Sequence, residues 1–377
     1  MIYYDNAATT KVFDECLEDL KVFNCEKYYN PSALYGEASK IKGLISAVRE
    51  NVKKYLHAPE GNLYFLSSGS EGDNTVLFGA KKKKGAKIVV DEGEHDAIYN
   101  CALELKNQGY AVEFAPIKSD GAVDVEKLSQ MLDENVCLVS IMHVSNETGA
   151  VNDLKSISQI IKRKCPNALF HSDGVQAFGK IEINLRECGV DAYTISGHKI
   201  HAPKGIGALW VKNGVNVKPL IYGGGQEFGF RSSTENVAGI MAFGTACDKM
   251  FKDFSHNNSK KAEIREYLMA NLLKNVPGTV VISPENGASH ILTVAFKNLR
   301  GEVLLHALEK KDVIVGIGSA CSSHRESRFK KLLGLDEFHR YGIVRFSFGL
   351  FNTLEEAEKA AGIICDTANE WNKFVRK

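Results

Sequence analysis

A short apolar run, Ala192-Tyr193-Thr194-Ile195, leads directly into Ser196-Gly197-His198-Lys199. The loop Ile200-His201-Ala202-Pro203-Lys204-Gly205 follows it, so the lysine is expected where a buried strand has just ended. A lysine in such a place can act as an amine nucleophile rather than as a solvated charge. The stretch therefore predicts a reactive amine at one edge of a sheet, and the rest of the sequence is interpreted outward from it.

The first part of the chain alternates between short apolar runs and longer amphipathic stretches. The expected strands are Leu63–Leu66, Lys87–Val90, Ala111–Phe114, Val136–Met142, Ala168–Ser172, Ala192–Ile195 and Ala208–Val211, and the expected helices cover about 71–84, 95–108, 124–134 and 153–164. Such alternation predicts an α/β fold in which helices cover both faces of a mostly parallel, seven-stranded sheet. Ligands bind beyond the carboxyl ends of strands in such sheets, which is where the polar motifs of this chain fall.

The pattern changes after Gly223-Gly224-Gly225. Two long helices are expected near 235–254 and 258–275, followed by strands near 279–282, 291–296 and 343–348 and by helices near 301–311 and 354–374. This part of the sequence predicts a smaller α+β domain. We expect a large domain over residues 15–255 and a small domain built from residues 1–14 and 256–377.

The composition excludes several classes of protein. The chain has 377 residues, 44% of them hydrophobic, and its 47 basic residues balance 46 acidic ones. No charge excess suggests a nucleic acid or an anionic membrane as a partner, and no apolar run is long enough for a membrane span. The nine scattered cysteines contain no C-x-x-C pair, so we expect neither a disulfide framework nor a metal site. With no signal peptide at its start, the protein is expected in the cytoplasm.

An acid and a small-residue turn suggest which cofactor the lysine would hold. Asp173 follows the expected strand 168–172 and could keep a pyridine nitrogen protonated, as pyridoxal 5'-phosphate (PLP) requires. The turn Ser67-Ser68-Gly69-Ser70-Glu71 could hold a phosphate at the start of a helix, with Ser196 and His198 as further donors. Gln176 could reach the phenolic oxygen of the ring. The alternative for Asp173 is a helix-capping role, and the alternative for Gln176 is an ordinary surface position.

Two further polar residues follow expected strands. His95 opens a helix and could stack on the cofactor and transfer protons, or it could simply cap that helix. Asn146 lies in a polar turn and could bind cofactor and substrate, or it could be a turn asparagine.

Two residues of the later part of the chain also carry possible chemistry. Cys321 lies in the small, polar stretch Gly318-Ser319-Ala320-Cys321-Ser322, which suits a nucleophilic thiolate, although an incidental exposed thiol is the alternative. Arg345 lies inside an apolar strand, where a charge needs a partner. A substrate carboxylate and an internal salt bridge are both suitable partners.

The whole chain resembles the cysteine desulfurases of the NifS/IscS type, in the class V group of fold-type I PLP enzymes. The matching motifs are Tyr4-Asp5-Asn6-Ala7-Ala8-Thr9-Thr10, Asn30-Pro31-Ser32, Gly69-Ser70-Glu71-Gly72-Asp73-Asn74, Glu94-His95, His171-Ser172-Asp173, Ser196-Gly197-His198-Lys199, Gly223-Gly224-Gly225-Gln226-Glu227, Arg231-Ser232-Ser233-Thr234-Glu235-Asn236 and Gly318-Ser319-Ala320-Cys321-Ser322. Their joint order and spacing make the resemblance specific.

The resemblance implies roles for individual residues. Lys199 would bond covalently to PLP, Asp173 would pair with the ring nitrogen, Gln176 with the ring oxygen, and His95 would stack on the ring. The remaining implied roles are phosphate binding by Gly69, Ser70, Ser196 and His198, phosphate binding in the neighbouring subunit of a homodimer by Thr234, and substrate carboxylate binding by Arg345 and Asn146.

The implied reaction converts L-cysteine to L-alanine and leaves the sulfur as a persulfide on Cys321. Lys199 or His95 would remove the α-proton of the substrate. A sulfur-acceptor protein, in iron–sulfur cluster assembly or in tRNA thiolation, would then take the sulfur. The alternatives are a selenocysteine lyase or another class V PLP enzyme.

The chain departs from the usual family pattern at a few positions. Ser233 stands where glycine is common, Phe228 stands where arginine is common, and Tyr35 stands where histidine is common. The segment after Cys321 is a little shorter than in close IscS relatives. These departures leave the expected PLP chemistry intact and concern the acceptor partner.

Overall fold

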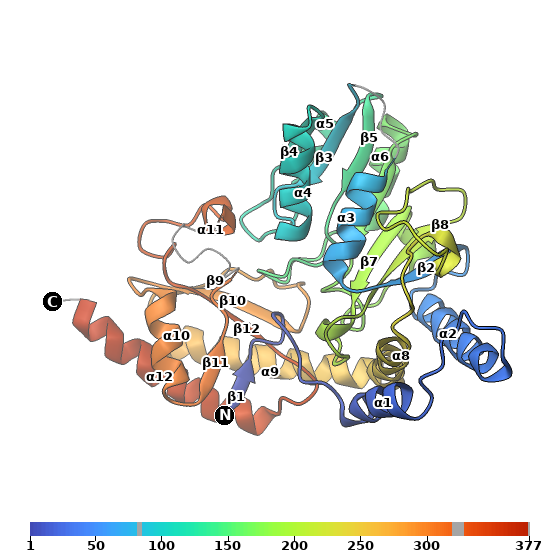
Figure 1. Ribbon diagram of the computed structural model, residues 1–377. Helices are drawn as coiled ribbons and strands as arrows, with labels where there is room; N and C mark the ends of the chain where they lie inside the picture. Colours follow the sequence, from blue (N-terminus) through green and yellow to red (C-terminus); the bar gives the residue numbers. More distant parts are fainter. Residues whose placement is uncertain (81–84, 319–327, 376–377) are drawn as a thin grey trace.

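The computed structural model describes residues 1–80, 85–318 and 328–375 (Figure 1). In chain order the helices and strands are β1 Ile2–Tyr4, α1 Asp14–Cys25, α2 Gly36–Tyr55, β2 Gly61–Leu66, α3 Gly69–Gly79, β3 Lys87–Asp91, α4 Asp96–Asn107, β4 Ala111–Ala115, α5 Val125–Met131, β5 Val136–Ser140, α6 Leu154–Lys164, β6 Leu169–Asp173, α7 Leu185–Cys188, β7 Ala192–Ser196, β8 Gly207–Lys212, α8 Val237–Lys252, α9 Phe254–Asn275, β9 Thr279–Val281, β10 Ile291–Phe296, α10 Gly301–Glu309, β11 Val313–Val315, α11 Arg328–Leu332, β12 Ile343–Ser347 and α12 Leu354–Val375.

The large sheet has seven strands in the order β2-β8-β7-β6-β5-β3-β4. Strand β8 is antiparallel to both of its neighbours, whereas the pairs from β7 through β4 are all parallel. The expected mostly parallel, seven-stranded sheet is therefore confirmed. Parallel pairing brings the carboxyl ends of β3, β5, β6 and β7 to one edge of the sheet, which is where the polar motifs of the sequence lie.

Helices cover both faces of this sheet, and alternate strand residues supply the two cores. Val89 and Val139 pack into one apolar cluster with residues of α2, α6 and α8. Their neighbours Ile88 and Leu138 pack into a second cluster with residues of α3 and α4. This alternation follows from the two-residue repeat of side-chain direction in a strand. Burial on both faces also explains why these strands are continuous apolar runs in the sequence.

The later part of the chain forms two small sheets, one with the antiparallel order β12-β10-β9 and one in which β1 pairs in parallel with β11. A further apolar cluster joins Tyr4 with residues of α9, β10, β12 and α12. The N-terminal strand thus packs with the C-terminal elements (Figure 1). The assignment of residues 1–14 and 256–377 to a separate domain stays a prediction.

In the described part of the chain, no helix is long and apolar enough to cross a membrane.

The sequence prediction was incomplete in the N-terminal region. It contained neither α1 nor α2, and it extended the helix that follows β2 to residue 84, whereas α3 ends at Gly79. In α2 the buried residues Ala38, Ile41, Ile45, Arg49 and Val52 lie on one face. An arginine in that series interrupts the apolar stripe by which an amphipathic helix is recognised.

Arg49 is buried because it anchors the loop before α8. Its Nη1 and Nη2 atoms each lie 2.7 Å from a carboxylate oxygen of Glu227, and the Phe65 N–H donates to the same carboxylate at 2.8 Å. The loop reaches this position with two left-handed residues, Glu227 at φ 49° and Phe228 at φ 58°. Such a conformation is unfavourable for residues other than glycine, so the buried ion pair has to offset it.

Replacing Arg49 with Met should destabilise the protein strongly, because it leaves the Glu227 carboxylate buried without its cation. The expected loss of unfolding free energy is about 3–5 kcal/mol, visible as a lower urea midpoint. The control is Lys155→Met, which removes an exposed ion pair with Glu187 and should leave the midpoint nearly unchanged. Equal midpoints for the two variants would contradict this role of Arg49.

Candidate active site

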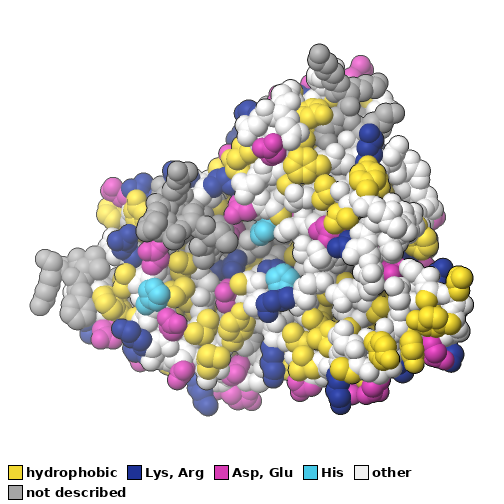
Figure 2. All heavy atoms as spheres, viewed as in Figure 1, with side chains coloured by type: hydrophobic (Ala, Val, Ile, Leu, Met, Phe, Trp, Pro, Cys, Tyr) yellow, Lys and Arg dark blue, Asp and Glu magenta, His cyan; other side chains and the backbone are white. Residues whose placement is uncertain are grey.

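A cavity of about 470 Å³ lies at the carboxyl edge of the large sheet and brings most of the predicted site residues together. Those that line it are Gly69, Ser70, His95, Asn146, Asp173, Gln176, Ser196, His198, Lys199 and Arg345. In Figure 2, histidine, basic and acidic side chains gather near the middle of the viewed face. Two predicted residues are not among the lining residues: Thr234 lines a separate cavity of about 220 Å³, and Cys321 lies outside the described residues.

Lys199 ends a short 3₁₀ turn, Gly197–Lys199, directly after β7. Its Nζ donates hydrogen bonds to the backbone carbonyls of Ala7 at 2.5 Å and Ala8 at 2.7 Å. Burial, together with the nearby Arg345 cation, lowers the pKa of this amine to about 8. Near physiological pH, the neutral fraction of the Lys199 amine is therefore larger than that of an ordinary lysine. The neutral amine is the nucleophilic form.

Asp173 is the last residue of β6, and its side chain lies in the cavity wall. One carboxylate oxygen accepts the Val175 N–H at 2.8 Å. Burial raises the pKa of the carboxyl group, while the nearby His95 and Lys199 act in the opposite direction. A cation placed in the cavity next to Asp173 would therefore favour its ionised form.

The first turn of α3 forms another wall of the cavity. Ser68 caps the helix by accepting the Glu71 N–H at 3.1 Å, and Gly69 and Ser70 follow it. A Cβ atom at Gly69 would lie 2.8 Å from Cγ2 of Val175, so only glycine fits the close contact between this turn and the loop after Asp173. The first N–H groups of a helix have no partners within it, which suits an anion at this position.

Two histidines, His95 and His198, line the cavity, and each is oriented by a contact of its Nδ1 atom. His95 caps α4, and its Nδ1 accepts the Ala97 N–H at 3.1 Å, so the proton of the neutral ring is on Nε2. His198 precedes Lys199, and its Nδ1 lies 3.2 Å from Oγ1 of Thr9. Burial, with the Lys199 cation as a further cause, lowers the pKa of His198 to about 4. His198 is therefore a neutral hydrogen-bonding group rather than a cation.

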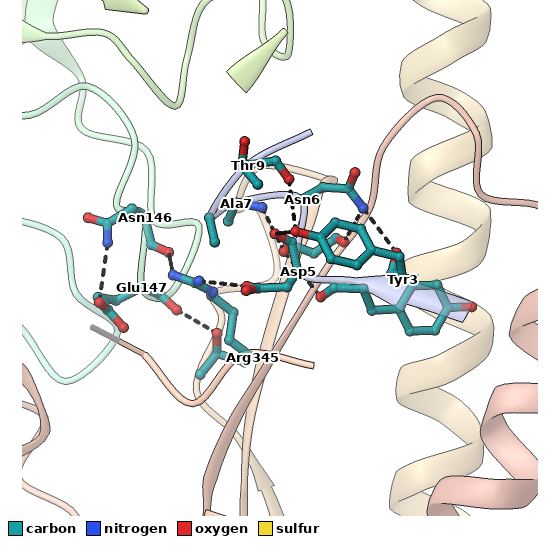
Figure 3. Close-up of polar contacts among 12 residues, drawn as sticks. Tyr3, Asp5, Asn6, Ala7, Thr9, Asn146, Glu147 and Arg345 are labelled. Carbon is teal, nitrogen blue, oxygen red and sulfur yellow. Dashed lines mark hydrogen bonds and ion pairs between the residues drawn. The ribbon is translucent and has the colours of Figure 1, made fainter. Parts of the chain in front are cut away.

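Arg345 enters from β12 and forms the internal salt bridge that was one of the two alternatives from the sequence (Figure 3). Its Nη2 pairs with the Asp5 carboxylate at 3.0 Å, and its Nη1 donates to the Asn146 carbonyl at 2.6 Å. Its Nε is buried and has no hydrogen-bond partner. The internal salt bridge therefore exists, and Arg345 also lines the cavity.

The Asn146 side chain is oriented by its neighbour. Its Nδ2 donates to the Glu147 carboxylate at 3.2 Å (Figure 3). The other Glu147 oxygen lies close to Gly318, where a Cβ atom would be only 2.6 Å from it. Gly318 has φ 82° and also lines the cavity, so the residue before the undescribed segment 319–327 forms part of the cavity wall.

Sequence reasoning assigned no role to several residues that shape the cavity. Asp5, Ala7 and Ala8 hold Arg345 and Lys199, and their only signal was the N-terminal motif Asp5-Asn6-Ala7-Ala8 within the family resemblance. Backbone carbonyls leave no residue-type signal, so the contacts of Ala7 and Ala8 were not predictable from composition. Among the described residues, no group of three or more His, Cys, Asp or Glu side chains is placed to hold a metal ion.

Comparisons with known proteins identify the class to which this fold and cavity belong. Residues 2–359 match the family model described as aminotransferase class-V. A cysteine desulfurase IscS of Clostridium botulinum is 36% identical over 95% of this chain and 91% of its own length. A solved NifS-like protein is 32% identical over 98% of this chain and 99% of its own, with a TM-score of 0.90. The structure titled SspA in complex with cysteine is 27% identical over 94% of this chain and 100% of its own, with a TM-score of 0.81.

The fold and the cavity are those of a fold-type I, PLP-dependent α/β enzyme. The chain belongs to the class-V aminotransferase family and, within it, to the cysteine desulfurases of the NifS/IscS type. PLP is the cofactor of this family.

The residues of the cavity fit PLP. An amine of lowered pKa, a buried carboxylate and a glycine-lined helix start lie around one space, as an aldehyde, a pyridine nitrogen and a phosphate require. The contact that excludes a Cβ at Gly69 keeps the helix start close to the loop that follows Asp173. The individual roles of the lining residues stay predictions.

The lowered pKa of Lys199 predicts how covalent PLP uptake depends on pH. The rate should rise as the amine loses its proton, reach half of its maximum at about pH 8 and level off above that. Stopped-flow absorbance of the apoprotein mixed with PLP over a range of pH measures it, with Lys199→Ala as the control that shows no covalent phase. A midpoint near the usual lysine value of about 10.4 would contradict the lowered pKa.

Proposed function

We propose that this chain is a PLP-dependent cysteine desulfurase that converts L-cysteine to L-alanine and passes the sulfur through Cys321 to an acceptor. The observation that carries the proposal is the cavity in which the buried Lys199 amine, the Asp173 carboxylate and the Arg345 guanidinium come together. The similarity to cysteine desulfurases over 95% of the chain supports the choice of substrate.

Arg345 and Asn146 would bind the carboxylate of the substrate. Both residues line the cavity, and a guanidinium is a natural partner for a carboxylate. The Asp5 contact holds the guanidinium plane in place, because it occupies Nη2 at 3.0 Å. Binding would therefore need little rearrangement of Arg345.

Bound PLP supplies the electron sink that makes the α-proton of cysteine removable. Of the two candidate bases, the contacts favour Lys199. Its amine has a lowered pKa and is therefore partly neutral, whereas Nδ1 of His95 already accepts the Ala97 N–H and is not free to take a proton. His95 would then act as a hydrogen-bond donor above the ring rather than as the base.

Cys321 would take the sulfur. Its thiolate would attack the substrate sulfur and form an S–S bond, the substrate C–S bond would break with its electron pair going to Cβ, and a proton taken up at Cβ would complete the methyl group of alanine. Gly318 lies in the cavity wall, and the three residues from Gly318 to Cys321 span at most about 10 Å of extended chain.

The protein would act as a homodimer in which Thr234 serves the neighbouring subunit. Thr234 lines a separate cavity with Arg231 and Ser67, away from Lys199 of its own chain, which suits a contact across an interface. Exposed apolar side chains also occur on nearby loops and the segment before α2: Tyr28, Leu34, Tyr35, Tyr222 and Phe228. A second copy would cover them.

The acceptor would be a protein of iron–sulfur cluster assembly or of tRNA thiolation, and the site of action would be the cytoplasm. A selenocysteine lyase on the same cavity is the alternative. It is distinguished by comparing L-cysteine with L-selenocysteine as the substrate at equal concentration.

The Cys321→Ser variant should bind PLP normally yet form alanine from L-cysteine at least about a hundredfold more slowly, because no thiolate removes the sulfur. The measurement is alanine and sulfide release by the purified holoenzyme. Cys25→Ser, which removes the exposed cysteine at the end of α1, is the matched control and should keep the wild-type rate. Equal alanine from the wild type and Cys321→Ser would overturn the persulfide step.

The homodimer can be tested through Phe228, whose side chain is 75% exposed. Phe228→Asp should shift sedimentation velocity from dimer to monomer, because it places a charge in the proposed interface. The control is Glu285→Lys, which changes the charge of an exposed residue between β9 and β10 and should leave the dimer intact. A wild-type protein that sediments as a monomer at micromolar concentration would contradict the dimer.

A further inference from the structure

A buried lysine next to the cavity has no part in the chemistry described above. Lys180 follows the turn after Asp173 and is only 6% exposed. Its Nζ donates a hydrogen bond of 2.6 Å to Oε1 of Gln176, which lines the cavity. Among the described residues it forms no salt bridge, and the Asp173 carboxylate acts on it from a longer range. Burial of an amine costs free energy unless the amine is hydrogen-bonded or paired, so its contact with Gln176 matters for stability.

The contacts of Gln176 fix which end of its amide faces the cavity. A lysine amine next to an amide oxygen can donate to it, and His290 Nε2 also approaches Oε1, at 3.4 Å. On the other side, the Gln176 Nε2 donates to the carbonyl of Ala7 at 2.8 Å, and that carbonyl can only accept. The amide oxygen therefore points to Lys180, and the second N–H of the NH₂ group is left for the cavity.

The same carbonyl links this arrangement to the reactive amine. Ala7 accepts from Lys199 at 2.5 Å as well as from Gln176. The contacts thus run from Lys180 through Gln176 and Ala7 to Lys199. His290 agrees with this orientation, since its Nδ1 is buried without a partner while its Nε2 faces Oε1, as expected when Nε2 carries the proton.

We propose that Lys180 is a positioning residue that holds the Gln176 amide with an N–H toward the cavity, where it donates to the anionic ring oxygen of bound PLP. This inference rests on the proposed function. Without Lys180 only the contacts with Ala7 and His290 hold the amide, so it turns over more readily and can present its oxygen to that anion, which is repulsive. Lys180 acts through Gln176 and does not itself touch the cofactor.

The electrostatics of the site agree with this role. Burial, followed by the nearby Lys199 and Lys261, lowers the pKa of Lys180. Cations gathered in the interior favour a negative charge in the adjoining cavity, and the ring oxygen and phosphate of PLP would supply it.

The test uses the holoenzyme with Lys180→Met, Lys180→Arg and, as a surface control, Lys106→Met on α4. The readouts are the dissociation constant of PLP and the position of its visible absorption maximum. Lys180→Met should weaken PLP binding about tenfold or more and shift the maximum, because a charge-assisted contact is lost and the amide is no longer oriented. Lys180→Arg keeps a donor and should restore most of both, and Lys106→Met should match the wild type.

A double-mutant cycle separates positioning from a merely structural role. If Lys180 acts through Gln176, Lys180→Met should weaken PLP binding less than about twofold in a Gln176→Ala background. Additive losses, or a Lys180→Met variant with unchanged PLP affinity and absorption, would overturn the inference. Failure of the wild-type protein to bind PLP at all would instead overturn the proposed function. If Lys180→Met does not fold, the PLP dissociation constants of Lys180→Arg and Gln176→Ala are compared instead. Lys180→Arg should bind PLP nearly as the wild type does and Gln176→Ala should bind it more weakly, and equal constants for the two variants would overturn the inference.

Discussion

The structure of the site depends on the hydrogen bonds between the Lys199 amine and the N-terminal segment. The carbonyls of Ala7 and Ala8 accept its hydrogen bonds, and among the described residues no carboxylate forms a salt bridge with it. Carbonyls can hold an amine without fixing its charge, whereas a paired carboxylate would raise its pKa and keep it protonated. The amine is thereby kept in place and kept reactive.

The N-terminal segment is itself held in place by hydrogen bonds to strand β12 of the small sheets. The Asn6 side chain donates to the backbone carbonyl of Ser347 at 2.9 Å, and the Ala7 N–H donates to the Ser347 hydroxyl at 2.8 Å. Strand β12, which contains Ser347, also supplies Arg345. Residues far apart in the sequence therefore position the amine and the predicted substrate-binding guanidinium together. Figure 3 shows the contacts around Arg345 and the N-terminal segment.

The sequence predicted the parts of this arrangement that depend on strand ends. Asp173 and Lys199 follow apolar runs, and parallel pairing of β6 and β7 brings such positions to one edge of the sheet. The parts that depend on tertiary contacts were not predictable. The burial of Arg49 depends on Glu227, which lies 178 residues away in the chain, and the Ala7 carbonyl has no signature in the sequence. The position of Cys321 is not described, so its role still rests on the family resemblance and on its chain distance from Gly318.

The central claim is that Lys199 is the residue to which PLP bonds. Reduction of the PLP-loaded protein with borohydride, followed by proteolysis and mass spectrometry, measures it directly. The account predicts that the pyridoxyl group is found on the peptide that contains Lys199 and on no other lysine, including the buried Lys180. A label on another lysine, or none on the peptide that contains Lys199, would contradict the account.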